Sequence, residues 1–373
     1  MPTIVPERLA KLEERVAREV DAGLLPAAQY AVGLGGEIVA QGTLGDATDD
    51  TRFVLFSATK ALVASTVWTC LGEGSIKLES KVADMIPEFA SNGKEDITVE
   101  QVMLHTSGFP RNPWGAEMAT SAGRRVRFAQ WKTNWAPGTA YEYHPTSAHW
   151  VLAELLEVAT GQNYLDVIEQ RVTKPLGLPR VLGLAPDQQQ NIAELQLVGD
   201  KMSPDELEAI LGVREIPVGE VTPEALLSFN EPDRRELGVP GGGGVATATT
   251  YATFYQGLLH NDKGIWGDDV LADVKTNVRN NFGDPLFNTP ASRTVGLVLA
   301  GDDGKASMRG MGKTQSPGTF GHNGAGGQIA WADPASGLSF VYLTNGLDQH
   351  LVREARRGVA LSSIAAELTK PLD

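Results

Sequence analysis

Cysteine is almost absent from this sequence, since Cys70 is the only one among 373 residues. A single cysteine can form neither an internal disulfide nor a cysteine-based metal site, so nothing points to an oxidising compartment. Long hydrophobic runs are missing too. No segment holds about 18 consecutive uncharged apolar residues, and the N-terminus leads into a charged amphipathic segment without the apolar core of a signal peptide. We therefore expect a cytoplasmic protein that does not enter a membrane.

Positive charge is also scarce. The chain has 32 basic and 46 acidic residues, which gives a formal net charge of −14. Such a surface repels phosphate backbones, so nucleic acid is not an expected partner. The composition, 42% apolar and 21% charged, is that of a globular protein, and the length allows one large domain or two ordinary ones.

The two ends of the chain carry matching patterns. Apolar residues recur at helical spacing over 6–24, and the β-rich runs 28–34 and 37–42 flank a Gly-Gly turn. Near the C-terminus, the runs 328–332 and 338–344 predict a second hairpin, followed by a helix over 351–368. These patterns predict that both ends build one antiparallel sheet with helices packed against it.

The middle of the chain is mostly helical in pattern. Its clearest helix covers 151–160 and ends at Gly161, whereas 188–200 is too polar and weakly patterned to assign. The glycine run 241–244 predicts a turn or a close backbone approach. We therefore expect an α+β fold with an α/β domain made of 1–75 and 241–373, a helical domain inserted at 76–240, and the active site in the cleft between them.

A reactive serine is not marked by the most familiar motif, because no serine lies in G-x-S-x-G. Two serines have a lysine three residues on, Ser57 with Lys60 and Ser91 with Lys94. Around Ser91 the Asn-Gly pair favours a turn, which breaks any shared helical face and predicts a solvated loop.

Ser57, in contrast, follows an apolar run and precedes the helical stretch 58–71. The start of a helix offers unpaired N–H groups, and the i, i+3 spacing brings Lys60 near the Ser57 hydroxyl. Lys60 can act as a base only if burial lowers its pKa, and the apolar residues after it are compatible with burial. The alternative, in which Ser57 caps the helix and Lys60 is an ordinary surface lysine, stays open from this stretch alone.

Together with two later segments, this stretch resembles the serine β-lactamase and penicillin-binding-protein superfamily. It is most similar to the class C-like branch that includes the family VIII carboxylesterases. The first motif, S-x-x-K, is 57–60, and the proline-glycine lead-in of the second begins at Pro137 and runs to Tyr143. The third motif is the His-Asn-Gly of 322–324, followed by a strand. The resemblance runs from about residue 10 to the C-terminus and implies the same fold that the two chain ends predict.

The resemblance implies a role for each matching position. Ser57 would be the nucleophile, Lys60 its base and Tyr143 the proton relay, with Tyr141 as a rival two residues away. The oxyanion hole would be formed by the backbone N–H groups of Ser57 and of Ala325, the latter on the strand after Gly324. Tyr143 could have a lowered pKa beside two cations and share protons with Lys60. The residues expected to bind substrate are His322, Asn323, Gly324, Trp114 and Trp135.

Two departures from the family pattern narrow the expected substrate. Pro145 stands where many relatives have an asparagine amide, and His322 stands where β-lactamases and transpeptidases have a lysine. A mostly neutral imidazole is a poorer anchor for a carboxylate than a lysine, so an uncharged ester fits better than a β-lactam.

The tryptophans of the segment 114–150 could form an aromatic acyl or alcohol pocket, and core packing is the alternative for them. His144 and His149 are five residues apart, which does not place them on one helical face, so we expect local hydrogen bonding and no metal. No cofactor is expected.

The sequence therefore predicts a serine hydrolase that cleaves small carboxylic esters through an acyl-enzyme on Ser57. An amidase, D-peptidase, weak β-lactamase or acyltransferase on the same machinery is the alternative. A protein that only binds an acylating ligand is a rival from another class. The oligomeric state stays open.

Overall fold

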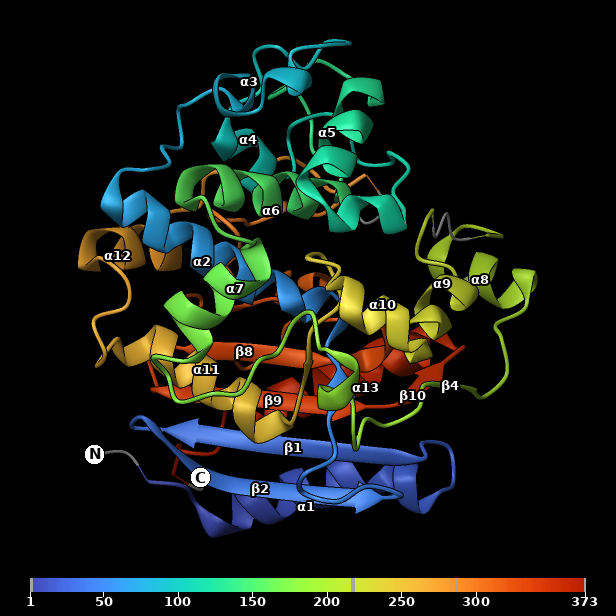
Figure 1. Cartoon of the computed structure of the whole chain (residues 1–373). Helices are drawn as coiled ribbons and strands as arrows, with labels where there is room; N and C mark the ends of the chain where they lie inside the picture. The colour runs from blue at the N-terminus through green and yellow to red at the C-terminus, as the bar shows by residue number, and fades with distance from the viewer. Residues whose placement is uncertain (1–2, 216–218, 286–287, 372–373) are drawn as a thin grey trace.

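The centre of the molecule is a six-stranded antiparallel sheet, seen in a computed structural model that describes residues 3–215, 219–285 and 288–371 (Figure 1). The strands lie in the order β2-β1-β9-β8-β7-β6. Their bounds are β1 Ala27–Leu34, β2 Glu37–Gly45, β6 Val298–Leu299, β7 Phe320–Gly321, β8 Ile329–Asp333 and β9 Leu338–Thr344. The predicted α+β fold is confirmed, and both hairpins form where the sequence predicts them.

Pairing between β1 and β9 joins the two ends of the chain. Ala28 lies opposite Thr344, and Leu34 lies opposite Leu338, so the N-terminal hairpin and the C-terminal hairpin share one continuous sheet. The first hairpin turns at Gly35 and Gly36, which both have positive φ and therefore suit glycine.

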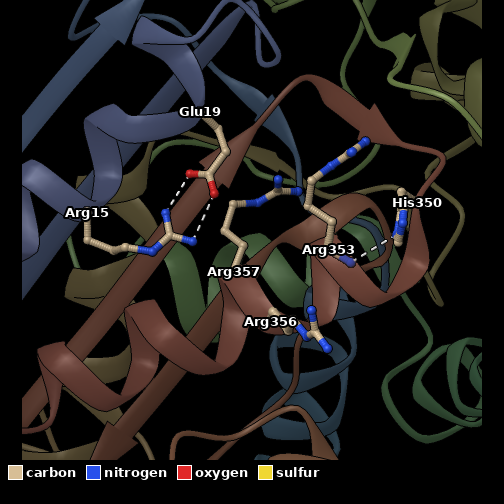
Figure 2. A pocket seen from close by; sticks show the side chains of 6 residues that line it. All are labelled: Arg15, Glu19, His350, Arg353, Arg356 and Arg357. Atoms are coloured by element: carbon tan, nitrogen blue, oxygen red, sulfur yellow. Dashed lines mark hydrogen bonds and ion pairs between the residues drawn. The ribbon is translucent and has the colours of Figure 1, made fainter. Parts of the chain in front are cut away.

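Two helices from opposite ends of the chain cover one face of the sheet. They are α1, Pro6–Asp21, and α13, Leu351–Ala365, and they contact each other directly. Leu12 and Val16 of α1 and Leu361 of α13 belong to the same apolar cluster as Trp331 and Tyr342 of the sheet. Figure 2 shows the polar side chains where these two helices meet above that cluster. Both helices were predicted from their apolar periodicity.

The opposite face of the sheet carries α11, Ala248–His260, which contacts β1, β8 and β9. The long helix α2, Thr59–Glu73, lies beyond it and contacts α12, Asp268–Thr276. Every residue of α2 from Thr59 to Cys70 is buried, so this helix is enclosed on all sides and not on one face alone. Cys70 is a free, buried thiol.

The remaining helices gather mainly at the top and right of Figure 1. Their bounds are α3 Val82–Met85, α4 Val99–Met103, α5 Ser121–Gln130, α6 Ser147–Thr160, α7 Tyr164–Ile168, α8 Pro204–Leu211, α9 Pro223–Leu227 and α10 Pro232–Leu237. Helix α6 begins four residues before the predicted 151, because its first turn is buried and Ser147 Oγ donates a hydrogen bond to the carbonyl oxygen of Phe109 at 2.9 Å. None of the helices in the described part of the chain is long and apolar enough to cross a membrane.

Two small two-stranded sheets lie beside the main sheet, and one of them includes a strand from the middle of the chain. Strand β4, Gln196–Val198, pairs in parallel with β10, Gly346–Asp348, and β3, Phe53–Val54, pairs with β5, Val245–Ala246. The sequence analysis assigned no element to the stretch that contains β4. The division into two domains at 75 and 240 stays a prediction, and β4 shows that part of the expected insertion pairs with a strand from the C-terminal part of the chain.

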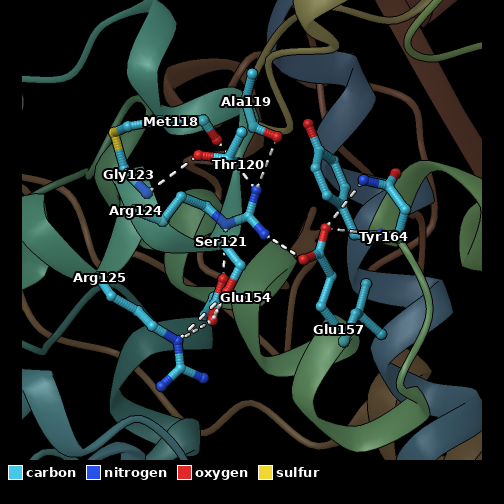
Figure 3. Close-up of polar contacts among 12 residues, drawn as sticks. Met118, Ala119, Thr120, Ser121, Gly123, Arg124, Arg125, Glu154, Glu157 and Tyr164 are labelled. Atoms are coloured by element: carbon cyan, nitrogen blue, oxygen red, sulfur yellow. Dashed lines mark hydrogen bonds and ion pairs between the residues drawn. The ribbon is translucent and has the colours of Figure 1, made fainter.

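A buried ion-pair cluster fixes α5 to α6 (Figure 3). Arg124 Nε lies 2.8 Å from Glu154 Oε2, and neither side chain has any exposed surface. Glu154 also accepts hydrogen bonds from Arg125 Nε at 2.7 Å and from Ser121 Oγ at 2.7 Å. Arg124 Nη2 lies 2.5 Å from Glu157 Oε2. A charge held this deep is tolerated only while its partners stay in place.

Replacing Glu154 by alanine is expected to lower the free energy of unfolding by about 3–5 kcal/mol, because Arg124 is then a buried charge without its main partner. Urea denaturation followed by circular dichroism measures the loss. Glu88→Gln is the matched control, since it removes the exposed partner of Arg125 and costs at most about 1 kcal/mol. Equal losses for the two variants would contradict the assignment.

Candidate active site

Ser57 lies in a short 3₁₀ turn, Phe56–Ala58, that runs directly into α2. It is therefore inside the first turn and does not cap the helix. Phe56 has a φ of 45°, a left-handed backbone conformation that is unfavourable for a side chain with a Cβ. Its ring packs edge-on against Phe229, with the centroids 5.6 Å apart. The residue before the expected nucleophile thus holds backbone strain of the kind found at functional sites.

Glycines let other backbone segments approach this turn. A Cβ at Gly324 would collide with the carbonyl oxygen of Leu55, and a Cβ at Gly241 would lie 2.7 Å from the carbonyl oxygen of Pro145. The predicted close approach of the 241–244 run is confirmed. The consequence is that three chain segments far apart in sequence meet around Ser57 and Lys60.

Lys60 is fully buried and is held by three oxygens. Its Nζ lies 3.2 Å from Ser57 Oγ and donates to the carbonyl oxygens of Pro145 and Gly241, each at 2.6 Å. Burial, with a smaller contribution from the Arg293 charge, lowers the pKa of Lys60 to about 7, while Glu220 acts in the opposite direction. Lys60 is therefore no ordinary surface lysine. At neutral pH a large share of it is an uncharged amine within reach of the Ser57 hydroxyl.

Tyr143 lies over the same pair. Its ring centroid is 5.1 Å from Lys60 Nζ and 5.3 Å from the Arg293 guanidinium carbon. Burial raises the pKa of Tyr143 above its ordinary value, and the nearby Ser57 and Arg293 offset that rise only in part. The expectation of a lowered pKa was therefore wrong, because desolvation outweighs the cations. Tyr143 is a neutral phenol that can donate a proton.

The rival tyrosine is engaged elsewhere. The Tyr141 hydroxyl accepts a hydrogen bond from Arg293 Nε at 3.0 Å, and the Arg293 guanidinium lies over both tyrosine rings. The geometry favours Tyr143 over Tyr141 as the tyrosine that serves Ser57.

Ala325 does not lie on a strand. It begins a 3₁₀ turn, Ala325–Gly327, which lies between Gly324 and Gln328, the two residues of an isolated β-bridge. The sequence analysis placed it on a strand because the apolar run after Gly327 is a strand, but the glycines at 326 and 327 have positive φ and bend the chain before β8. Ser57 and Ala325 nevertheless line the same cleft.

His322 faces Tyr143 across the cleft, with ring centroids 5.8 Å apart. Only 7% of His322 is exposed, and burial holds its pKa well below the ordinary value, so it is neutral. Its Nδ1 is 2.8 Å from the carbonyl oxygen of Asn323, which places the proton on Nδ1. The Asn323 amide is tied down by Gly310 and Ala330. His322 therefore presents an unpaired nitrogen and no positive charge.

The two tryptophans expected to bind substrate do not line the cleft that the described residues form. Trp114 donates through Nε1 to Glu220 at 3.1 Å and packs against Trp150. Trp135 packs edge-on against His144. Both side chains pack against residues around the site, which favours the packing alternative, and a role of Trp114 and Trp135 in binding substrate stays a prediction.

The cleft itself has a volume of about 560 Å³. Besides Ser57 and Tyr143, it is lined by Glu220 and Arg293, which sequence reasoning missed. Neither residue belongs to a motif or to a periodic pattern, so no sequence signal marked them. Burial raises the pKa of Glu220, whose carboxylate accepts hydrogen bonds from Thr146 and Trp114.

Histidines fill the space behind Tyr143. The His105 ring lies 5.0 Å from the Tyr143 ring and 6.1 Å from the His149 ring. His144 Nδ1 lies 2.6 Å from the carbonyl oxygen of Glu142, and its Nε2 accepts from the backbone N–H of Phe109, so the expected local hydrogen bonding is found for His144. Neither ring nitrogen of His149 has a hydrogen-bond partner among the described residues, so the same expectation was wrong for His149. Among the described residues, no three or more His, Cys, Asp or Glu side chains are grouped to hold a metal.

The second serine–lysine pair lies elsewhere. Lys94 Nζ is 3.1 Å from Ser91 Oγ and donates to the carbonyl oxygens of Ser91 and Trp131. Ser91 is in a loop as predicted, but the Lys94 side chain is buried and not solvated. Neither residue lines the cleft, so this pair ties a loop to the end of α5.

The chain belongs to the Beta-lactamase family, whose sequence model matches residues 12–363. Its fold is that of a penicillin-binding protein homologue from Caulobacter crescentus (23% identity, TM-score 0.77, 97% of this chain and 98% of the other). It is also that of a family VIII carboxylesterase (23% identity, TM-score 0.75, the same shares of the two chains).

Among curated proteins, the chain is similar to "Esterase/beta-lactamase LipL" of Mycobacterium tuberculosis, with 26% identity over 83% of this chain and 72% of the relative. It is also similar to a "Putative D-alanyl-D-alanine carboxypeptidase" of Escherichia coli (25% identity, 91% and 82%). A third relative is "Esterase EstB" of Burkholderia gladioli (26% identity, 80% and 78%).

Proposed function

We propose that this protein hydrolyses carboxylic esters of small molecules through a covalent acyl-enzyme on Ser57. Ser57 Oγ attacks the ester carbonyl carbon while its proton passes to the neutral amine of Lys60. The carbon–oxygen bond to the alcohol then breaks, and Tyr143 donates the proton that the leaving alkoxide needs, recovering one from Lys60. Water then attacks the acyl carbonyl carbon and gives a proton to Lys60, the bond between that carbon and Ser57 Oγ breaks, Oγ takes the proton from Lys60, and the acid is released.

The observation that carries this proposal is the state of Lys60. A lysine with a pKa of about 7, whose Nζ lies 3.2 Å from a serine hydroxyl in a cleft, has the two properties of a general base, proximity and an available lone pair. We assign the oxyanion hole to the backbone N–H groups of Ser57 and Ala325, which line the same cleft.

An uncharged ester is favoured because His322 is neutral where many family members carry a lysine. Two of the similar curated proteins are named esterases. The cleft of about 560 Å³ is large enough for a small ester.

A second candidate is a D-peptidase or amidase, and Arg293 favours it. Its guanidinium lines the cleft beside Tyr141 and Tyr143 and could receive a substrate carboxylate. One curated relative carries the name of a carboxypeptidase.

We further propose that the cleft lies between two domains, 1–75 with 241–373 and the insertion 76–240. Ser57, Arg293 and His322 line it from the first, and Tyr143 and Glu220 line it from the second. The cytoplasmic location expected from the sequence stays a prediction.

A panel of esters, D-amino acid amides and β-lactams, graded by acyl size, tests the proposal when kcat/KM is measured for each. Intact-mass spectrometry after a rapid acid quench detects the acyl adduct, and Ser57→Ala is the control that cannot form it. We expect the highest kcat/KM on esters. A higher kcat/KM on D-amino acid amides than on esters would favour the second candidate. An acyl adduct without turnover would show that the protein only binds an acylating ligand. If neither an adduct nor turnover is detected, the assignment as a serine hydrolase is overturned.

A further inference from the structure

A second cavity lies outside the active-site cleft, where α1 meets α13 (Figure 2). Its volume is about 340 Å³, and it shares no lining residue with the cleft. All six side chains that line it are charged or imidazole groups: Arg15, Glu19, His350, Arg353, Arg356 and Arg357. Four of these six side chains are arginines, so the cavity is cationic.

The charges around this cavity do not balance. Four arginines line it, and two carboxylates face them: Glu19, which binds Arg15, and Asp348, which pairs with Arg353 and Arg357. Asp200 also acts on the charge of Arg353, so four positive charges less three negative ones leave a charge of +1. A fourth carboxylate, Glu354, is nearby on α13, and burial raises its pKa to about 7. This local excess stands out in a chain with a net charge of −14.

Arg357 supplies independent evidence for a ligand, because two of its buried donor atoms lack a hydrogen-bond acceptor. Only 1% of this residue is exposed, and its Nη1 lies 3.3 Å from Asp348 Oδ2. Its Nε and Nη2, however, have no hydrogen-bond partner among the described atoms. Figure 2 shows the side chain extending between the Arg15–Glu19 pair and Arg353. Buried charged donors are rarely left unpaired, because their desolvation is costly.

The hydrogen-bond donors of the cavity are mainly guanidinium groups, and these favour a phosphate group as the ligand. A guanidinium presents parallel N–H groups that match two oxygens of a phosphate group, and no lysine is among the lining residues. His350 adds one more donor, because its Nδ1 accepts from the backbone N–H of Arg353 at 3.3 Å, which leaves the proton on Nε2.

We propose that this cavity binds a small dianion of the phosphate class, either inorganic phosphate or the phosphate group of a small monoester. A dianion offsets the positive charge of the lining, and its oxygens accept hydrogen bonds from Arg357 Nε and Nη2, which have no other partner among the described residues, and from Arg356 at the rim. The site lies directly behind the Ala325–Gly327 turn, since a Cβ at Gly327 would be 3.3 Å from Arg357 Nη2.

Isothermal titration calorimetry on the full chain tests the proposal, with inorganic phosphate and glycerol 3-phosphate as ligands at constant ionic strength and chloride as the reference anion. We expect one site for at least one of the two phosphates at millimolar concentrations or below, and the tighter ligand identifies the source. The absence of binding by both, or an equal response to chloride, would overturn the proposal.

Two variants locate the site. Arg357→Gln removes the central donors and should weaken binding about tenfold or more. Because Arg357 also binds Asp348 and the variant could fail to fold, Arg356→Gln, which changes only an exposed rim residue, provides the second measurement and should also weaken binding. Arg18→Gln is the matched control, since it removes the same charge from the exposed side of α1. Equal affinities for Arg356→Gln and Arg18→Gln would contradict the proposed location.

Discussion

Replacing Lys60 by alanine is expected to lower kcat/KM for an ester about 10³-fold or more, without changing the fold of the sheet. The loss is large because Lys60 Nζ lies 3.2 Å from Ser57 Oγ. Among the described residues, no other amine or imidazole is hydrogen-bonded to that hydroxyl. Steady-state hydrolysis of a short-chain ester measures the effect, and circular dichroism shows whether the variant is folded.

Two control variants separate the base from its alternatives. Lys60→Arg keeps the positive charge and the donors but cannot lose a proton at neutral pH, so it should be as inactive as Lys60→Ala. Lys94→Ala removes the lysine of the second serine–lysine pair and should stay within about threefold of the wild-type rate, although it loses some stability with the bonds to Ser91 and Trp131. An inactive but folded Lys94→Ala variant, or an active Lys60→Arg variant, would discredit the choice of Ser57.

The pH profile of the wild-type enzyme gives the same assignment a second check. Lys60 acts as a base only when it is deprotonated, and burial lowers its pKa to about 7. The value of kcat/KM should therefore increase as the pH rises through about 7, and it should be low at pH values well below 7, where the amine is protonated. A lysine with its ordinary pKa of about 10.4 would place the rise some three units higher.

Local signals account for what could be predicted of the fold. The hairpin β1–β2 is marked by two β-rich runs around Gly35-Gly36, and α1 and α13 are marked by apolar residues on one face. Each of these patterns lies within a short segment, so periodicity and turn residues suffice to find it. The pairing of β1 with β9 could be inferred only because both ends of the chain carried the same kind of element.

Contacts between distant segments could not be predicted in this way. Strand β4 has only three residues and pairs with β10 about 150 positions later, where no turn connects the two strands. Arg293 and Glu220 reach the cleft through loops, and no motif marks either of them. The turn at Ala325 depends on two positive-φ glycines, which read equally well as part of a strand.

The electrostatics of the site illustrate the same limit. The resemblance implied that Tyr143 lies beside two cations, and proximity alone argues for a lowered pKa. Burial, which the sequence does not report for a single side chain, reverses that result for Tyr143 and lowers the pKa of Lys60. The shortage of positive charge in the whole chain likewise concealed a cluster of arginines on α13.

Replacing Tyr143 by phenylalanine should lower kcat/KM for an alkyl ester by about 10²–10⁴-fold, because the neutral phenol supplies the proton to the leaving alkoxide. The loss should be much smaller for a nitrophenyl ester, since nitrophenolate is stable enough to leave without a proton. Measuring both substrates on one enzyme preparation separates a proton donor from a residue that only shapes the site, which would affect both esters equally.

Tyr141→Phe is the matched control for this experiment. It removes one hydroxyl two residues away and breaks the hydrogen bond from Arg293 Nε, but it leaves Tyr143 over Lys60. We expect a loss of about tenfold or less, similar for the alkyl and nitrophenyl esters, because only the position of Arg293 changes. If the dependence on the leaving group were instead found in Tyr141→Phe, the relay would belong to Tyr141. The neutral phenol of Tyr143 would then serve only to pack against Lys60 and His322.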